Sequence, residues 1–201
     1  MRIKKQLADI SPEKVRAFYD SRAQSYNGAN LNNVTMLQDK NPELSEKRSR
    51  AEISKLLSKL KIDSESCILD FGCGSGRWLD ALPECIMKYR GIDFSAGLVE
   101  LARTNYKRNN AEFFTGSVLE ADRILAGELG TFNRVLMIGF LNHMNDSDIM
   151  TLLRGLPALI SDSALICVKA SIALEERLTL KDFYSEELRS EYESIYRTRD
   201  E

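Results

Sequence analysis

The sequence of 201 residues has no apolar run approaching the about 20 residues that cross a membrane. Its basic start lacks the apolar stretch of roughly 7–15 residues that a signal peptide requires. It also lacks a strong charge of either sign, because its net charge is −2 and Lys and Arg are interleaved with Asp and Glu. We therefore expect a cytoplasmic protein that binds no membrane and, without a basic face, no nucleic acid.

Cysteine and histidine are scarce. The four cysteines form no CxxC motif, and three of them lie in apolar segments, where a free thiol behaves as a small hydrophobic group. We therefore expect free thiols and no metal site. The single histidine, His143, then becomes the one side chain whose ordinary pKa suits proton transfer near neutral pH.

Short apolar runs separated by helical patterns begin at Cys67. Strands are predicted at residues 67–71, 89–93, 112–115, 134–139 and 164–169, with helices between them, notably at 96–108 and 146–160. This alternation predicts an α/β fold of Rossmann-like type, a mostly parallel twisted sheet with helices on both faces. Residues 1–45 are predicted to form an N-terminal helical cap and residues 46–201 the sheet domain, together one compact domain.

A glycine-rich loop follows the first predicted strand, in the run Asp70-Phe71-Gly72-Cys73-Gly74-Ser75-Gly76. Glycines after a buried strand let the backbone turn tightly and approach a ligand, and the next helix presents free N–H groups to an anion. The second predicted strand ends at Asp93, where an acid accepts hydrogen bonds from ribose hydroxyls in such sheets. The two features together predict a nucleoside cofactor.

The details of the loop favour S-adenosylmethionine over NAD. The dinucleotide fingerprint is GxGxxG, whereas the spacing here is GxGxG and Arg77 stands at the position of the third glycine. Asp70 would repel a pyrophosphate but would suit the ammonium group of a methionine moiety. The sequence also has no convincing Tyr-x-x-x-Lys pair for hydride transfer.

Residues 69–76, together with Gly91-Ile92-Asp93-Phe94-Ser95, resemble the first two motifs of the class I S-adenosylmethionine-dependent methyltransferases. The resemblance covers roughly residues 53–170. It implies that the loop residues Gly72, Cys73, Gly74 and Gly76 shape the methionine pocket and that Asp70 lies near its amino group. By the same resemblance Asp93 holds the ribose and Phe94 lies along the adenine.

Two positions depart from the family pattern. An acid that often accepts the adenine amino group is replaced by Ser117, whose hydroxyl can still make one hydrogen bond. The fourth strand opens with Phe132-Asn133, where the family usually has Phe-Asp. Neither change removes the predicted pocket.

The two ends of the chain carry weaker resemblances. Residues 18–23 resemble the N-terminal cap of small-molecule methyltransferases, which implies that Tyr19 and Arg22 face the cofactor. Residues 35–42 and the tail at 182–198 resemble a subgroup that modifies glycans and natural products, which implies a small-molecule or sugar acceptor. We interpret residues 182–198 as a tail helix. In class I sheets such a helix is usually followed by a final antiparallel hairpin. Because the chain ends at Glu201, we expect that hairpin to be missing and a homodimer to form through the exposed sheet edge.

Three functions remain open at this stage. The first is a methyltransferase in which His143, placed just past the fourth strand, acts as general base; the alternative is a loop histidine with local hydrogen bonds. The second is a binding protein that keeps the cofactor fold without turnover. The third, an NAD-dependent oxidoreductase, is disfavoured by the loop spacing.

Overall fold

The computed structural model of the chain describes residues 1–37 and 41–201. Its main sheet has the strand order β4-β3-β2-β5-β6, and every neighbouring pair in it is parallel. These strands are β2 (Cys67–Phe71), β3 (Lys88–Asp93), β4 (Ala111–Thr115), β5 (Phe132–Ile138) and β6 (Ile160–Lys169). The sequence-based expectation of a parallel, Rossmann-like sheet is confirmed, with β5 and β6 beginning earlier than expected.

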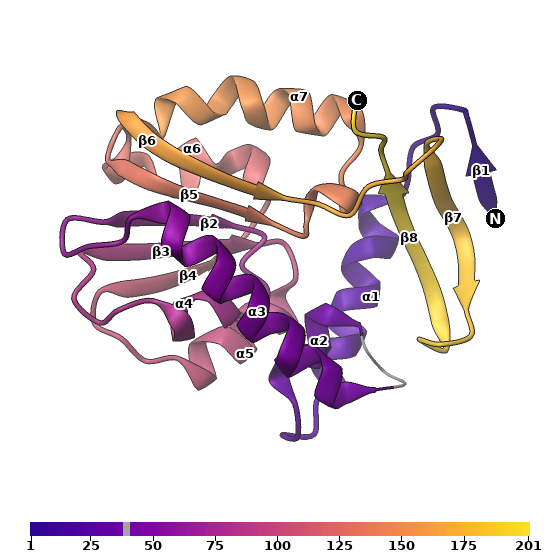
Figure 1. Cartoon of the computed structure of the whole chain (residues 1–201), viewed down its shortest axis with the longest axis horizontal. Helices are drawn as coiled ribbons and strands as arrows, with labels where there is room; N and C mark the ends of the chain where they lie inside the picture. The colour runs from indigo at the N-terminus through magenta and orange to yellow at the C-terminus, as the bar shows by residue number, and fades with distance from the viewer. Residues whose placement is uncertain (38–40) are drawn as a thin grey trace.

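Helices cover both faces of this sheet (Figure 1). One face packs on α3 (Pro42–Leu60), α4 (Arg77–Ala81) and α5 (Ala96–Asn105), and the other packs on α6 (Ala121–Ile124) and α7 (Asp146–Gly155). Short 3-10 turns connect them: η1 (Val118–Glu120), η2 (Ala126–Glu128), η3 (Leu141–His143) and η4 (Leu156–Ala158). No helix in residues 1–37 or 41–201 is both long and apolar enough to cross a bilayer.

The N-terminal segment contributes strand β1 (Arg2–Lys4) and helices α1 (Pro12–Gln24) and α2 (Leu31–Met36). Helix α1 begins after Ser11, whose hydroxyl accepts a hydrogen bond from the backbone N–H of Lys14 at 3.2 Å. Asp20 docks α1 on α5: its Oδ1 accepts hydrogen bonds from the Ser95 hydroxyl at 2.6 Å and the Gly97 N–H at 3.1 Å. The expected boundary at residues 45/46 falls inside α3, and residues 38–40 of the 35–42 motif lie outside the described residues.

The tail is an antiparallel hairpin, so its interpretation as a helix was wrong. Strands β7 (Leu178–Ser185) and β8 (Ser190–Tyr196) pair with each other, and β1 joins β7 to complete a small sheet of order β1-β7-β8. Residues 190–196 follow the strand period of two, which places Tyr192, Ser194 and Tyr196 on one face and Glu193 and Ile195 on the other. The non-glycine residue Arg189 supplies the left-handed turn with a φ of +49°.

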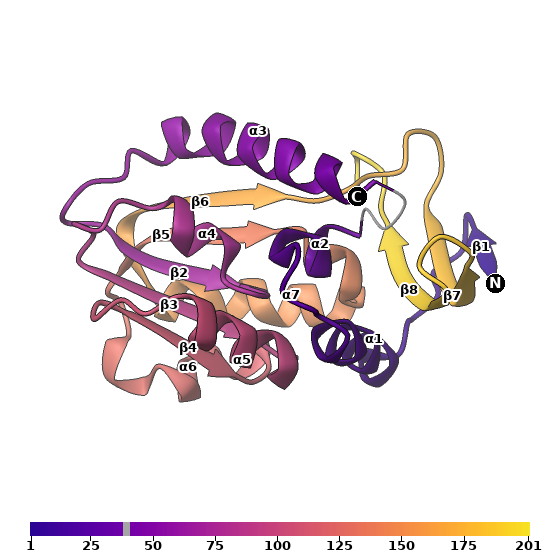
Figure 2. The same cartoon turned by 90° about the horizontal axis from the view of Figure 1, so that it is seen from below.

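The hairpin lies apart from the main sheet, at its carboxyl end beside α1 (Figures 1 and 2). As a result β6 remains an outer strand, and within the described part of the chain nothing pairs with its free edge. The apolar side chains of Leu165, Ile166 and Val168 on this strand are exposed. The homodimer through a sheet edge stays a prediction.

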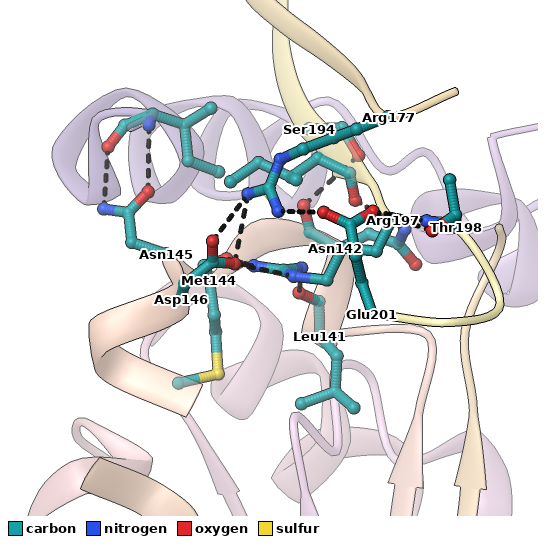
Figure 3. A network of polar contacts seen from close by, with 12 residues as sticks. Leu141, Asn142, Met144, Asn145, Asp146, Arg177, Ser194, Arg197, Thr198 and Glu201 are labelled. Atoms are coloured by element: carbon teal, nitrogen blue, oxygen red, sulfur yellow. Dashed lines mark hydrogen bonds and ion pairs between the residues drawn. The ribbon is translucent and has the colours of Figure 1, made fainter. Parts of the chain in front are cut away.

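Ion pairs and hydrogen bonds fasten the hairpin to the loop after β5 (Figure 3). Arg197 donates from Nε to Asp146 Oδ1 at 2.8 Å, and its guanidinium also donates to the carbonyls of Leu141 and Met144 at 3.1 and 2.8 Å. Arg177 pairs with Asp146 and Glu201, both at 2.9 Å. Partial burial raises the pKa of Asp146, but the hydrogen bonds from both arginines outweigh this and hold it below its ordinary value.

Replacing Arg197 with Ala is expected to lower the free energy of unfolding by about 1–3 kcal/mol, because two backbone carbonyls and a carboxylate lose their donor. Urea unfolding followed by circular dichroism measures this change. Arg199→Ala is the matched control, since Arg199 is exposed, and it is expected to stay within about 0.5 kcal/mol of wild type. Equal effects of the two substitutions would contradict the role given to Arg197.

Candidate functional site

A cavity of about 1010 Å³ lies at the carboxyl ends of the parallel strands, between the main sheet and the segments α1, α2 and β8. Ligands of α/β sheets bind at this edge, and pockets for small ligands measure about 300–1,000 Å³. The cavity is therefore large enough for a cofactor together with a small second ligand. Seven of the ten residues expected to bind the cofactor line it: Tyr19, Gly72, Cys73, Gly74, Asp93, Phe94 and Ser117.

The glycine-rich loop is held open to the cavity by its backbone. Gly72 and Gly74 have positive φ angles of 69° and 55°, and a Cβ on Gly72 would lie 2.5 Å from the Cβ of Phe140. The N–H groups of Gly72 and Cys73 donate to the carbonyl of Ile92 at 2.9 and 3.2 Å. This fixes the loop against the end of β3, beside the acid predicted to hold a ribose.

Asp93 joins the loop to the start of α5. Its Oδ2 accepts a hydrogen bond from the Gly74 N–H at 2.9 Å, and its Oδ1 accepts one from the Ser95 N–H at 2.9 Å. Burial raises the pKa of Asp93 to about 6, while these N–H donors act in the opposite direction. The carboxylate is therefore mostly ionised above neutral pH, and it keeps acceptor capacity for ligand hydroxyls.

Three of the predicted cofactor residues do not line the cavity. Asp70 is buried within β2, where it accepts a hydrogen bond from the Tyr89 hydroxyl at 2.6 Å, and burial raises its pKa to about 7. Gly76 caps α4, and a Cβ there would meet the ring of Tyr106 at 2.8 Å. The guanidinium of Arg22 donates to backbone carbonyls of α2, at 2.8 Å in each case, and so holds α2 against α1.

Phe94, Ser117 and Cys73 present different chemistry to the cavity. The ring of Phe94 packs near the guanidinium of Arg16, at 5.6 Å. The Ser117 hydroxyl accepts from the Leu119 N–H at 3.2 Å, which leaves its proton free to donate to a ligand. Burial raises the pKa of the Cys73 thiol well above its ordinary value, so this side chain stays protonated and is a poor nucleophile.

His143 lies between α1 and β8, with both ring nitrogens engaged. Nε2 lies 2.9 Å from the Tyr19 hydroxyl, and Nδ1 lies 3.1 Å from the carbonyl oxygen of Glu193. A carbonyl can only accept, so Nδ1 carries the proton and Nε2 accepts from Tyr19. Burial lowers the pKa of His143 to about 4 and raises the pKa of Tyr19, so both groups are neutral at physiological pH. These partners are distant in sequence, unlike those of a locally bonded loop histidine.

The sequence-based predictions missed two sets of residues that line the cavity. Helix α3 contributes Arg48, Glu52 and Lys55, and strand β8 contributes side chains that the helical interpretation of the tail had placed elsewhere: Tyr192, Ser194 and Tyr196. The charged residues of α3 recur at i, i+4 and i+7, which puts them on one face of the helix. The alternation in residues 190–196 was the corresponding signal for the hairpin.

Comparison with known proteins identifies the sheet region. Residues 68–162 match a family described as "Methyltransferase domain". The chain is also similar to a 23S rRNA (uracil(1939)-C(5))-methyltransferase of Stenotrophomonas maltophilia, with 31% identity over 100 residues that make up 48% of this chain and 22% of that protein.

Solved structures share the fold. Phosphoethanolamine N-methyltransferase 1 of Haemonchus contortus, in complex with phosphoethanolamine and S-adenosylhomocysteine, superposes with a TM-score of 0.67 at 16% identity, over 81% of this chain and 32% of that one. A SAM-dependent methyltransferase of Leishmania major gives a TM-score of 0.62 at 13% identity, over 98% of this chain and 74% of that one. The chain thus spans less than a third of the rRNA methyltransferase and about a third of the Haemonchus enzyme. Residues 68–162 thus match a methyltransferase domain family, and the chain shares the fold of S-adenosylmethionine-dependent methyltransferases.

Proposed function

We propose that the protein transfers a methyl group from S-adenosylmethionine to a small-molecule or sugar acceptor. The observation that carries this proposal is that the glycine-rich loop with Asp93 and the Tyr19–His143 pair line the same cavity. One part of the cavity therefore has the features of a nucleoside site, and another has a proton acceptor. This combination is what methyl transfer to a protonated nucleophile requires.

The residues around the loop fit the cofactor. A side chain at Gly72 would strike Phe140, so the packing of Phe140 and the positive φ both require glycine at this point of the cavity wall. Asp93 offers its remaining lone pairs to ribose hydroxyls, and Ser117 offers a donor after β4. When bound, S-adenosylmethionine supplies an electrophilic methyl group on its sulfur.

Tyr19 and His143 are suited to remove the acceptor's proton. Methylation of a neutral hydroxyl or amine would leave positive charge on the acceptor atom, which would make its proton acidic. A base with a pKa near 4 is then strong enough to take it. Tyr19 passes its own proton to Nε2 of His143 and takes the acceptor's proton in return, while the Glu193 carbonyl holds Nδ1–H and fixes the imidazole orientation.

The size and lining of the cavity support a small acceptor. Side chains of α1, α2, α3 and β8 line it on the side away from the sheet. The cavity of about 1010 Å³ has the size that suits a small acceptor beside a cofactor. The similarity to the rRNA methyltransferase covers only 48% of this chain. Phosphoethanolamine, which is bound in the Haemonchus complex, is one small molecule to include in a screen for acceptors.

Asp93→Asn is expected to weaken binding of S-adenosylhomocysteine by about tenfold or more, because the ribose hydroxyls lose a charged acceptor. Isothermal titration calorimetry of wild type and variant measures the effect, with NADH as a control ligand. Asp162→Asn, which changes an exposed acid on β6, is expected to bind like wild type. A folded wild-type protein that binds no S-adenosylhomocysteine would refute the proposed function.

His143 is expected to remain neutral down to about pH 5 in the ligand-free protein, because its burial disfavours the charged imidazolium and lowers its pKa from 6.5 to about 4. It is the only histidine, so its imidazole signals in an NMR titration need no separation from others. Constant chemical shifts between pH 5.5 and 8 are the expected result. A midpoint near 6.5 would show that the ring is exposed and that the link to Tyr19 and Glu193 does not persist in solution.

A further inference from the structure

We propose that the part of the cavity lined by α3 binds an anionic group of the acceptor, a phosphate or a carboxylate. This inference rests on the proposed function, because it assigns the acceptor's chemical class at the same site. It is carried by cations from three separate elements that converge there: Arg48 and Lys55 of α3, Arg77 at the start of α4 and Lys169 at the end of β6.

One face of α3 is turned to the cavity. The lining residues Arg48, Ala51, Glu52, Lys55 and Leu56 are spaced at i, i+3, i+4, i+7 and i+8, which places them along a single stripe of the helix. Other basic residues of the same helix, Lys47 and Lys59, are exposed and do not line the cavity. Arg48 and Lys55 are exposed as well, so what sets them apart from Lys47 and Lys59 is that they line the cavity.

Glu52 neutralises only part of this positive charge. Its Oε1 lies 2.9 Å from the Arg77 guanidinium and its Oε2 lies 3.1 Å from the Lys169 ammonium, so one carboxylate serves two cations. Arg48 and Lys55 have no carboxylate within ion-pair distance among residues 1–37 and 41–201. In this part of the lining four cations accompany one carboxylate, and an added anion would relieve an excess of positive charge. The other acids that line the cavity, Asp93 and Asp148, belong to β3 and α7.

The unpaired indole N–H of Trp78 is a second, independent observation that supports an anion site. Its side chain lines the cavity and is only 3% exposed, and within the described part of the chain its indole Nε1–H has no hydrogen-bond partner. Buried donors are normally satisfied, so an unpaired one beside a cavity indicates a place for a ligand acceptor. The guanidinium of Arg77 lies 5.3 Å from the centre of the Trp78 ring, so this donor and the cations belong to the same region.

This chemistry selects an oxyanion. Guanidinium groups donate paired N–H bonds to carboxylates and phosphates, ammonium groups add a point charge, and an indole N–H donates to the same oxygens. Tyr19 and His143, the proton acceptors, are neutral at physiological pH and do not contribute to this charge. The acceptor would thus be held by its anionic group, with its nucleophile free to face the Tyr19–His143 pair.

The test is calorimetric titration of the protein saturated with S-adenosylhomocysteine, at low salt. The probes are inorganic phosphate, glycerol 3-phosphate with glycerol, and glucose 6-phosphate with glucose. We expect phosphate-bearing probes to bind and their neutral partners not to bind. The double variant Arg48→Gln/Lys55→Gln is expected to weaken phosphate binding by about tenfold or more, because it removes two charged donors, and to leave S-adenosylhomocysteine affinity within about twofold of wild type.

Lys47→Gln/Lys59→Gln is the matched control, since it removes the same charge from the same helix outside the cavity. It is expected to bind phosphate like wild type. Equal weakening in both double variants, or phosphate probes that bind no better than their neutral partners, would overturn the proposal. A parallel loss of S-adenosylhomocysteine affinity in Arg48→Gln/Lys55→Gln would also overturn it, since the cations would then serve the cofactor's carboxylate.

The same titrations on the protein without S-adenosylhomocysteine separate this proposal from the proposed function. Phosphate binding that depends on Arg48 and Lys55, in a protein that fails to bind S-adenosylhomocysteine, would keep the anion site and refute the methyltransferase activity. Binding of S-adenosylhomocysteine without phosphate binding would keep the proposed function and refute the anion site.

Discussion

Tyr19, His143 and the carbonyl of Glu193 form a partly buried chain of hydrogen bonds that ties α1 and β8 to the loop after β5. A buried imidazole must have both nitrogens satisfied, because an unpaired buried polar group costs about 1–3 kcal/mol. That requirement brings the N-terminal helix and the C-terminal hairpin to the same end of the main sheet. The cavity and its candidate proton acceptor depend on this contact between α1, β8 and the loop after β5.

Further buried polar contacts hold the same segments together. Asn142 donates to the carbonyls of Ser171 and Ile195 at 2.7 and 2.9 Å, next to the histidine in sequence. Glu193 accepts from the Ser11 N–H at 2.7 Å, where α1 begins, and from the Asp182 N–H at 3.0 Å. Fully satisfied networks of this kind specify one arrangement of the parts they join. The position of β8 over the cavity is thus set by polar contacts as well as by apolar packing.

The sequence was sufficient to predict the sheet and the loop, because their signals are local. Buried apolar strands, glycines with positive φ and an acid at the next strand end are properties of short segments, and the structure brings Gly72, Gly74 and Asp93 together. The tail was misjudged because its turn at Arg189 lacks glycine, and because the family resemblance outweighed the period of two in residues 190–196. In the sequence, the charged residues of α3 look like the solvated face of a helix. Only the fold shows that Arg48, Glu52 and Lys55 line the cavity.

The most direct test of the central claim, that one cavity holds both the cofactor and the reacting acceptor, is a crystal structure of the protein with S-adenosylhomocysteine. We predict that the ribose hydroxyls contact Asp93, that the amino-acid end lies along Gly72–Gly74, and that the sulfur faces the Tyr19–His143 pair. A ligand bound outside this cavity, or a sulfur directed away from Tyr19 and His143, would contradict it.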